Sequence, residues 1–290
     1  MKVAIVGAGR MGSAMAARLQ QAGNDVVVYN RTREKAEAVG AAVAETAREA
    51  AAWADTILVS LADDAAVLHA YGGPDGIAAG LRGGSVVVET STLDPETVHR
   101  VAELVGERGA ALLDGPVSGS VPLVEQGKLT FLVGGPADAL DQVRPVLDTL
   151  AAQIFHVGPL GSGAVVKLAV NTVLLAINQA VAEALVLAER AEVPRETTYE
   201  VLVNSAIASP FVAYKRAAFE RPDQTPVAFS LDLVAKDLGL IGQLAERVGA
   251  VMPQAAANRA AVLAALDVGM GSRDMAAIAH WLEVGVPNES

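Results

Sequence analysis

The 290-residue chain is long enough for two domains, and hydrophobic residues make up 52% of it, which is ample for packed cores. Its net charge of −11 argues against a nucleic-acid partner, because an acidic surface repels phosphate backbones. Because the chain has no cysteine, disulfides, thiolate zinc sites and a cysteine nucleophile are excluded, and a cytoplasmic location is favoured.

Short β-branched runs alternate with alanine-rich stretches from residue 2 to about residue 158. Buried strands are predicted at residues 3–6, 26–29, 56–61, 85–89, 111–113, 130–133 and 154–157. Helical spacing predicts helices between them, including residues 12–22, 33–39 and 95–108. Since this alternation requires right-handed crossovers, the segment predicts a doubly wound, mostly parallel sheet.

The pattern changes at residues 158–163, a stretch rich in glycine and proline. From residue 164 to about residue 191 the sequence predicts one uninterrupted helix about 42 Å long. Further helices are predicted at residues 195–204, 210–220, 230–249, 253–267 and 274–284. The chain is therefore predicted to have an α/β domain at residues 1–160 and an all-α domain at residues 161–290, which begins with the long joining helix.

No apolar run approaches the roughly 20 residues that an uninterrupted membrane span needs. The N-terminal apolar run is too short for the core of a signal peptide and predicts a buried strand. Residues 168–187 are the most apolar stretch, but Asn171, Asn178, Gln179 and Glu183 interrupt it. A soluble protein without a membrane partner is expected.

Gly7, Gly9 and Gly12 have the G-x-G-x-x-G spacing directly after the first predicted strand, with Arg10 and Met11 between the last two. In this context the glycines permit a tight turn, a close backbone approach to a pyrophosphate and close helix–strand packing. The helix that follows directs its positive N-terminus at the phosphates. The motif predicts a Rossmann dinucleotide site, the alternative being a glycine turn without a nucleotide.

The end of the second predicted strand selects between cofactors. An enzyme that uses NAD usually carries an acidic residue there, which binds the ribose 2′-hydroxyl. This chain instead has Asn30, Arg31 and Thr32, while Asp25 lies at the beginning of that strand. An arginine can bind a 2′-phosphate with two hydrogen bonds, so NADP(H) is favoured over NAD(H). The alternative is an arginine that is simply solvated on a turn.

Lys167 and Asn171 are four residues apart and therefore share one face of the long predicted helix. The apolar neighbourhood of the lysine is expected to lower its pKa. Such a group can protonate a carbonyl oxygen as a hydride arrives, and Asn171 can hold the same oxygen. The alternative is a surface lysine that extends into solvent beside a polar spot.

Three further clusters carry hydroxyl groups or charges. Ser118 and Gly119 follow a predicted strand in a turn that can bind a carboxylate through hydroxyl and amide groups, or else is a simple exposed turn. Ser91 and Thr92 follow the strand ending at Glu89, where a parallel sheet lines its crevice, or else cap a helix. Lys236 and Asp237 form either a solvated pair or a domain-closing contact. The four histidines are scattered without metal-like spacing, so no metal site is predicted.

Four motifs in order make the chain similar to the β-hydroxyacid dehydrogenase family. They are residues 6–16 with the glycines and two methionines, residues 114–120, the pattern G-x-G-x-x-x-K-x-x-x-N at residues 161–171, and residues 236–238. The resemblance covers essentially the whole chain. It implies a Rossmann domain plus an all-α domain, and a homodimer or homotetramer that often packs through its C-terminal domains.

By this resemblance Lys167 is the catalytic acid/base and Asn171 its partner. The implied substrate-binding residues are Ser118, Gly119, Thr92, Phe229 and Asp237. The candidate cofactor-binding residues are Gly7, Gly9, Arg10, Met11, Gly12, Asn30, Arg31, Thr32, Ser91 and Lys236.

Two positions depart from the family pattern. The family often has two consecutive asparagines after the lysine, whereas here Val170 precedes Asn171. The turn at residues 30–32 resembles that of glyoxylate/succinic semialdehyde reductases and of imine reductases, which typically lack the lysine. The prediction is an NADPH-dependent enzyme that transfers hydride between NADP(H) and a small aldehyde or keto acid. The alternatives are an imine reductase and a non-catalytic NADPH-binding module.

Overall fold

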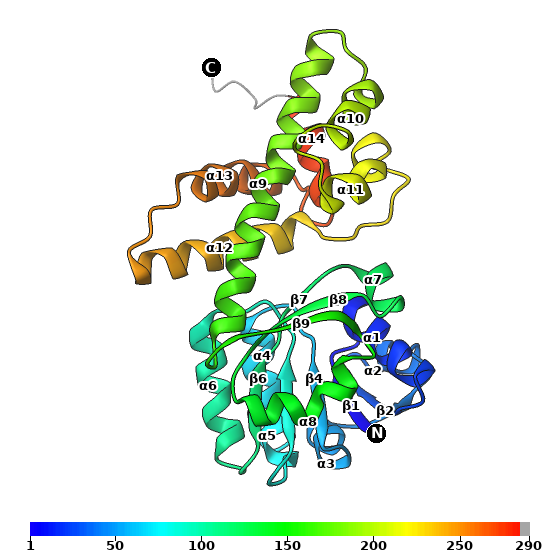
Figure 1. Ribbon diagram of the computed structural model, residues 1–290, viewed down its shortest axis with the longest axis vertical. Coiled ribbons are helices and arrows are strands. Elements are labelled where there is room, and N and C mark those ends of the chain that lie inside the picture. The colour runs from blue at the N-terminus through cyan, green and yellow to red at the C-terminus, as the bar shows by residue number, and fades with distance from the viewer. Residues whose placement is uncertain (285–290) are drawn as a thin grey trace. The chain divides into compact units, whose positions relative to one another are not determined.

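The structure is a computed structural model that describes residues 1–284 and forms two units, Met1–Lys167 and Leu168–Ser290 (Figure 1). The first unit includes the beginning of the long helix, which packs against the sheet through the glycine contacts described below.

One nine-stranded sheet is the framework of the first unit. Its strands are β1 (Lys2–Val6), β2 (Asp25–Tyr29), β3 (Ala42–Val43), β4 (Thr56–Val59), β5 (Val86–Glu89), β6 (Ala111–Asp114), β7 (Val117–Ser118), β8 (Leu129–Gly134) and β9 (Ala151–Gly158). The order is β3-β2-β1-β4-β5-β6-β8-β7, with β9 paired to β8. The first six strands are parallel in the doubly wound order, which confirms the predicted fold class, while β8 runs antiparallel to β6 and β7. The strands β3 and β7 have two residues each, too few for a sequence pattern to predict them.

Helices cover both faces of this sheet, because successive side chains of a strand point to opposite faces. They are α1 (Arg10–Gln21), α2 (Arg33–Glu37), α3 (Ala47–Trp53), α4 (Asp64–Tyr71), α5 (Ile77–Gly80), α6 (Pro95–Gly106), α7 (Val121–Glu125) and α8 (Ala137–Leu147). Ile5 of β1 packs in one core with Met15 of α1. The next residue, Val6, packs in a second core with Ala50 of α3 and Val101 of α6.

Four parallel strands end in one row across the sheet. Val6 pairs with Val59, Val59 with Glu89, and Glu89 with Asp114. The segments that follow these residues therefore leave the sheet at the same edge, which is where ligands bind in open α/β sheets.

The second unit is helical in the part of the chain that the structure describes. It contains most of α9 (Ser162–Arg190), followed by α10 (Arg195–Val203), α11 (Pro210–Glu220), α12 (Leu231–Val248), α13 (Pro253–Asp267), the 3₁₀ turn Met275–Ala277 and α14 (Ile278–Val284). These helices agree closely with the predicted ones, because their apolar spacing and the glycine and proline breaks are local signals.

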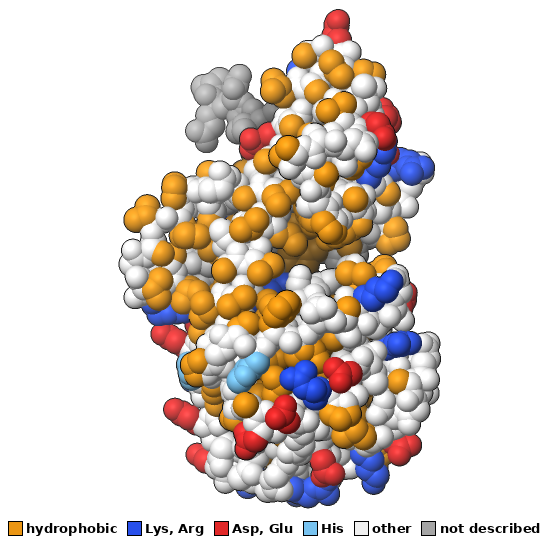
Figure 2. All heavy atoms as spheres, viewed as in Figure 1, with side chains coloured by type: hydrophobic (Ala, Val, Ile, Leu, Met, Phe, Trp, Pro, Cys, Tyr) orange, Lys and Arg blue, Asp and Glu red, His pale blue; other side chains and the backbone are white. Residues whose placement is uncertain are grey.

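The helix α9 is long and apolar enough to cross a bilayer by length and composition alone. Its residues Leu175, Val181 and Leu185 are nevertheless at most 3% exposed and pack in the core of the second unit. Of its most apolar 18-residue window, 39% is buried within the described structure. Figure 2 shows that hydrophobic side chains also reach the surface of the second unit, where Val173 and Leu187 of α9 are among the exposed ones.

A buried ion pair fixes the segment that leads into α12. Both carboxylate oxygens of Asp274 accept hydrogen bonds from Lys215 Nζ, at 2.6 and 2.9 Å, and both residues are almost fully buried. The same carboxylate accepts hydrogen bonds from the backbone amides of Ala228, Phe229 and Ala276. Asp274 therefore holds Phe229 in place before α12 begins.

Because a buried ammonium group deprived of its charge partner is costly, removing the carboxylate that pairs with Lys215 should destabilise the second unit strongly. We expect Asp274→Asn to lower the free energy of unfolding by about 3–5 kcal/mol. The matched control is Arg273→Gln, which removes the neighbouring exposed ion pair to Asp223 and should cost at most about 1 kcal/mol. Urea unfolding followed by circular dichroism measures both, and equal losses would contradict the role given to the buried pair.

Candidate functional site

The glycine turn between β1 and α1 is fixed by steric contacts that only glycine tolerates. Gly7 has a φ of +105°, and a Cβ on it would lie 2.2 Å from the carbonyl oxygen of Ser60. A Cβ on Gly12 would lie 1.9 Å from the carbonyl oxygen of Gly7. The first and third glycines of the motif therefore allow the turn and helix α1 to pack directly on the sheet.

The middle glycine differs from the other two. A Cβ on Gly9 would have no atom within 4 Å, and Gly9 is the N-cap of α1, where no side chain caps the helix. The backbone at this point thus faces open space at the positive end of a helix. These features fit the pyrophosphate of a dinucleotide, which needs a close backbone approach and amide donors.

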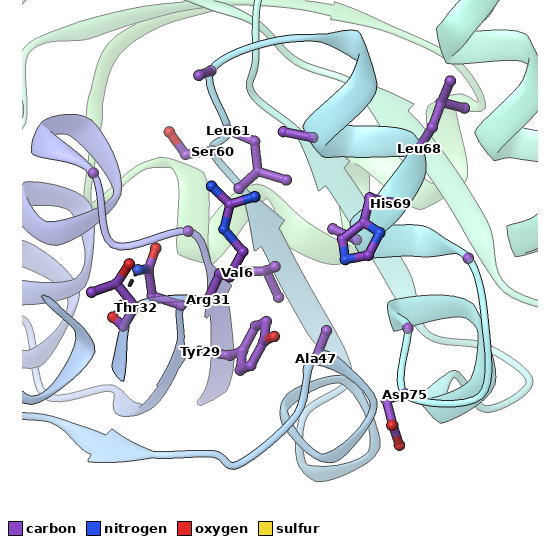
Figure 3. Close-up of a pocket in the computed structure, with 18 of the residues that line it drawn as sticks. Val6, Tyr29, Arg31, Thr32, Ala47, Ser60, Leu61, Leu68, His69 and Asp75 are labelled. Atoms are coloured by element: carbon purple, nitrogen blue, oxygen red, sulfur yellow. Dashed lines mark hydrogen bonds between the residues drawn. The ribbon is translucent and has the colours of Figure 1, made fainter. Parts of the chain in front are cut away.

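A cavity of about 750 Å³ adjoins this turn, within the size range of small-ligand pockets. Its lining includes Gly7 and Gly9 of the turn and Arg31, Thr32 and Lys35 after β2. Figure 3 shows Arg31 extending from the end of β2 into the cavity. Lys35 was missed in the sequence analysis. Its position in the sequence could have indicated it. Lys35 follows Thr32 by three residues in the first turn of α2, so its side chain lies on the side of the helix that faces the end of β2.

The side chain of Asn30 organises the turn. Its Oδ1 accepts a hydrogen bond from the backbone amide of Ala8 at 2.9 Å, and its Nδ2 donates to the carbonyl oxygen of Thr32 at 2.8 Å. Asn30 thereby links the glycine turn to the segment that bears Arg31. Both polar atoms of its amide group are engaged within the protein, and Asn30 also lines the cavity.

A buried carboxylate connects the loops that follow β4 and β5. Glu89 is 1% exposed and accepts hydrogen bonds from the backbone amide of Ser91 and from the hydroxyl of Tyr71. The hydroxyl oxygen of Ser91 in turn accepts a hydrogen bond from the backbone amide of Leu61, which lines the cavity. Burial raises the pKa of Glu89 to about 7, against the opposing effect of these hydrogen bonds. Sequence reasoning identified Ser91 as a site residue but not Glu89, because nothing local signals that the carboxylate is buried.

Ser118 is the last residue of β7, and Gly119 follows it; β7 lies beyond β6 and β8 in the sheet. Ser118 pairs with Thr130 in the sheet, and Gly119 follows it with a φ of +140°. This φ is one that residues with a side chain rarely adopt, and a Cβ on Gly119 would also lie 2.7 Å from Leu129 Cδ2, so glycine is favoured there. Ser118 is half-buried and Gly119 is exposed, which leaves their polar groups close to solvent. Thr92 is half-buried on the loop after β5, the neighbouring strand of β6.

Lys167 lies in the second turn of α9 and is half-buried. Asn171 is one turn further along and only 4% exposed. Its Nδ2 donates a hydrogen bond to Asp237 Oδ2 at 2.6 Å, and Asp237 also forms an ion pair with Lys236 at 2.8 Å. The second unit therefore brings together three predicted residues that are up to 66 positions apart in the chain. Phe229 precedes Lys236 and Asp237 in the chain. Its backbone amide donates a hydrogen bond to Asp274, as described above.

The raised pKa of Glu89 predicts a pH-dependent stability. Because the folded-state pKa lies above the unfolded value, the folded protein loses stability as the pH rises from about 4.5 through about 7. Glu89→Gln removes this loss, so the variant should gain about 3 kcal/mol relative to wild type between pH 4.5 and pH 8. The measurement is the free energy of unfolding of both proteins at several pH values. Glu103→Gln, at an exposed position on α6, controls for the lost charge, and a gain that does not vary with pH would disprove the role of burial.

Known proteins match both parts of the chain. The family model for the NAD binding domain of 6-phosphogluconate dehydrogenase matches residues 2–158. The model for the NAD-binding domain of NADP-dependent 3-hydroxyisobutyrate dehydrogenase matches residues 161–282. The 2-(hydroxymethyl)glutarate dehydrogenase of Eubacterium barkeri is 32% identical, over 96% of this chain and 93% of that protein. The chloroplastic glyoxylate/succinic semialdehyde reductase 2 of Arabidopsis thaliana is 30% identical, over 100% of this chain and 82% of the relative.

A solved structure agrees with these matches over both units. The crystal structure of 3-hydroxyisobutyrate dehydrogenase from Salmonella typhimurium is similar with a TM-score of 0.88 at 28% identity, covering 97% of this chain and 99% of that one. The two chains therefore share their overall fold. The chain belongs to the β-hydroxyacid dehydrogenase family of NAD(P)-dependent oxidoreductases.

Proposed function

We propose that the protein is an NADPH-dependent reductase of small aldehyde or keto acids, with glyoxylate and succinic semialdehyde as the favoured substrates. The observation that carries the cofactor choice is that Arg31, Thr32 and Lys35 line the same cavity as Gly7 and Gly9. The observation that carries the chemistry is the placement of Lys167 one helical turn before Asn171. The similarity to the Arabidopsis reductase supports the same substrate class.

The two cations after β2 favour a 2′-phosphate on the adenine ribose. The chain carries a net charge of −11, whereas this cavity is lined by two basic side chains, Arg31 and Lys35. Arg31 can bind a phosphate through two N–H groups, and Lys35 adds a second positive charge. Residues 29–32 contain no carboxylate, the group that usually accepts a hydrogen bond from the ribose of NAD.

The proton donor is Lys167. NADPH, when bound beside the glycine turn, would supply a hydride for the carbonyl carbon. As negative charge develops on the carbonyl oxygen, Lys167 Nζ donates a proton to it, and the products are a hydroxy acid and the oxidised cofactor. In the direction of oxidation Lys167 takes the proton from the hydroxyl group. Asp237 accepts a hydrogen bond from Asn171 Nδ2. This bond fixes the orientation of the side-chain amide and therefore the direction of its Oδ1.

The carboxylate of the substrate is assigned to Ser118 and Gly119, with Thr92 nearby. Hydroxyl and backbone N–H groups bind a carboxylate without a formal positive charge, as in other anion-binding turns. Phe229 is the candidate substrate contact in the second unit, where the Asp274 contacts hold its backbone in place. Groups that bind a carboxylate and a group that donates a proton suit a short molecule that carries both a carboxylate and a carbonyl.

The decisive experiment follows the loss of NADPH absorbance with glyoxylate, succinic semialdehyde, tartronate semialdehyde and methylmalonate semialdehyde, with NADH in parallel. Loss of the general acid should lower kcat by about 10²- to 10⁴-fold, so Lys167→Ala should be nearly inactive. Its Kd for NADPH, measured by fluorescence, should not change. Lys2→Ala is the matched control, because Lys2 begins β1 at the opposite edge of the sheet and contacts Trp53.

Two outcomes would contradict the proposal. Turnover of a cyclic imine but of none of the acids would identify an imine reductase. Tight NADPH binding with no turnover of acids or imines would identify a non-catalytic nucleotide-binding module.

The cofactor preference has its own test. Arg31→Ala and Lys35→Ala each remove a charged hydrogen-bond donor, so each should raise the Kd for NADPH by about 10- to 100-fold and leave that for NADH nearly unchanged. Arg33→Ala is the matched control, because Arg33 lies between them in sequence but forms ion pairs with Glu37 and Glu45. Equal effects on the two cofactors would refute the 2′-phosphate assignment.

A further inference from the structure

A buried aspartate that no step above uses anchors the start of the catalytic helix. Asp114 is the last residue of β6 and is 1% exposed. Its Oδ1 accepts a hydrogen bond from the backbone amide of Gly161 at 2.9 Å, and its Oδ2 accepts one from the amide of Ala164 at 2.8 Å. Both carboxylate oxygens are thus bound to the first turn of α9.

Glycines allow the helix to approach the sheet this closely. A Cβ on Gly163 would lie 2.3 Å from the carbonyl oxygen of Leu132 and 2.5 Å from that of Asp114. A Cβ on Gly134, in the strand beside β6, would lie 2.4 Å from Asp114 Oδ1. The backbone of α9 therefore contacts the sheet directly at this point, without side chains between them. A contact of this kind leaves little freedom for the helix to slide or rotate.

The electrostatics favour the same arrangement. The N-terminus of a helix carries partial positive charge and unpaired amide groups, both of which stabilise a carboxylate. Burial raises the pKa of Asp114, and the hydrogen bonds from Ala164 and Gly161 oppose that shift. The carboxylate and the start of the helix therefore stabilise each other.

Asp114 is also connected to the substrate side of the site through the main chain. The residues that follow it lead directly to Ser118 and Gly119. Three residues beyond Ala164, on the same helix face, lies Lys167. One residue thus joins the turn assigned to the substrate carboxylate with the helix that carries the proton donor.

We propose that Asp114 is a positioning residue, which fixes Lys167 relative to the turn at Ser118 and Gly119 by anchoring the first turn of α9. The inference rests on the proposed function for the role of Lys167. A shift of about 1 Å between reacting groups can lower a rate about 100-fold, so a modest loosening of this anchor has a large kinetic effect.

The first test is kinetic and uses Asp114→Asn in the full-length protein. Asparagine retains the shape but replaces one acceptor by an N–H group that faces a backbone donor, so one of the two bonds is lost. We expect kcat to fall about 10- to 100-fold, the pH profile of kcat to shift, and the Kd for NADPH to stay the same. Gly161→Ala is a milder second variant, because it keeps the carboxylate but strains a residue with a φ of +89°. It should change the same parameters in the same direction.

The matched control is Ser209→Ala. Ser209 caps α11 in the second unit by accepting a hydrogen bond from Val212, so its loss weakens a helix start that has no connection to Lys167. Its kcat and pH profile should remain those of wild type. Wild-type kcat and an unchanged pH profile in folded Asp114→Asn and Gly161→Ala would overturn the inference.

The second test does not depend on activity. Hydrogen–deuterium exchange of the backbone amides of residues 161–167 should be faster in Asp114→Asn than in wild type, and should be unchanged in Ser209→Ala. If wild type reduces none of the acids, the proposed function fails while this measurement still tests the anchor. Unchanged exchange in Asp114→Asn would overturn the anchor whatever the activity.

Discussion

The backbone hydrogen bonds between β1, β4, β5 and β6 bring Val6, Val59, Glu89 and Asp114 into one row. Every candidate group of the first unit depends on this register, because each strand passes into its functional turn at the same edge. A slip of one residue would point the side chains of a strand to the opposite face and separate the turns. The cavity beside Gly7 and the anchor at Asp114 are two consequences of the same parallel pairing.

Buried carboxylates then give the loops a defined geometry. Glu89 joins the segments after β4 and β5, Asp114 holds the start of α9, and Asp274 holds the segment before α12. Asp114 accepts two hydrogen bonds from backbone amides and Asp274 three, whereas Glu89 accepts one from the amide of Ser91 and one from the hydroxyl of Tyr71. The burial of a charged group requires such partners. Water cannot replace these contacts, so the loops are tied to the sheet or the helices at particular residues rather than by general apolar packing. The cost is in stability, as the raised pKa of Glu89 illustrates.

The first turns of α9 belong with the sheet because Gly163 allows direct backbone contact, whereas the rest of the helix packs in the all-helical core through Leu175 and Leu185. A single helix therefore carries Lys167 in one unit and Asn171 in the other. The proposed roles of the two residues depend on this continuity, since positions four residues apart on one α-helix have a fixed separation. The two residues are thus kept in register by local geometry alone.

Local signals in the sequence determined the doubly wound sheet, the helical second unit and the glycine turn, because hydrophobic period, helix breaks and G-x-G-x-x-G spacing act over a few residues. They also determined the separation of Lys167 and Asn171. Only the tertiary structure decided which polar groups meet over long separations. Examples are Asn30 with Ala8, Glu89 with Tyr71 and Lys215 with Asp274. The physical reason is that hydrogen bonding and burial of a charge depend on what the fold brings beside it, which no local pattern encodes.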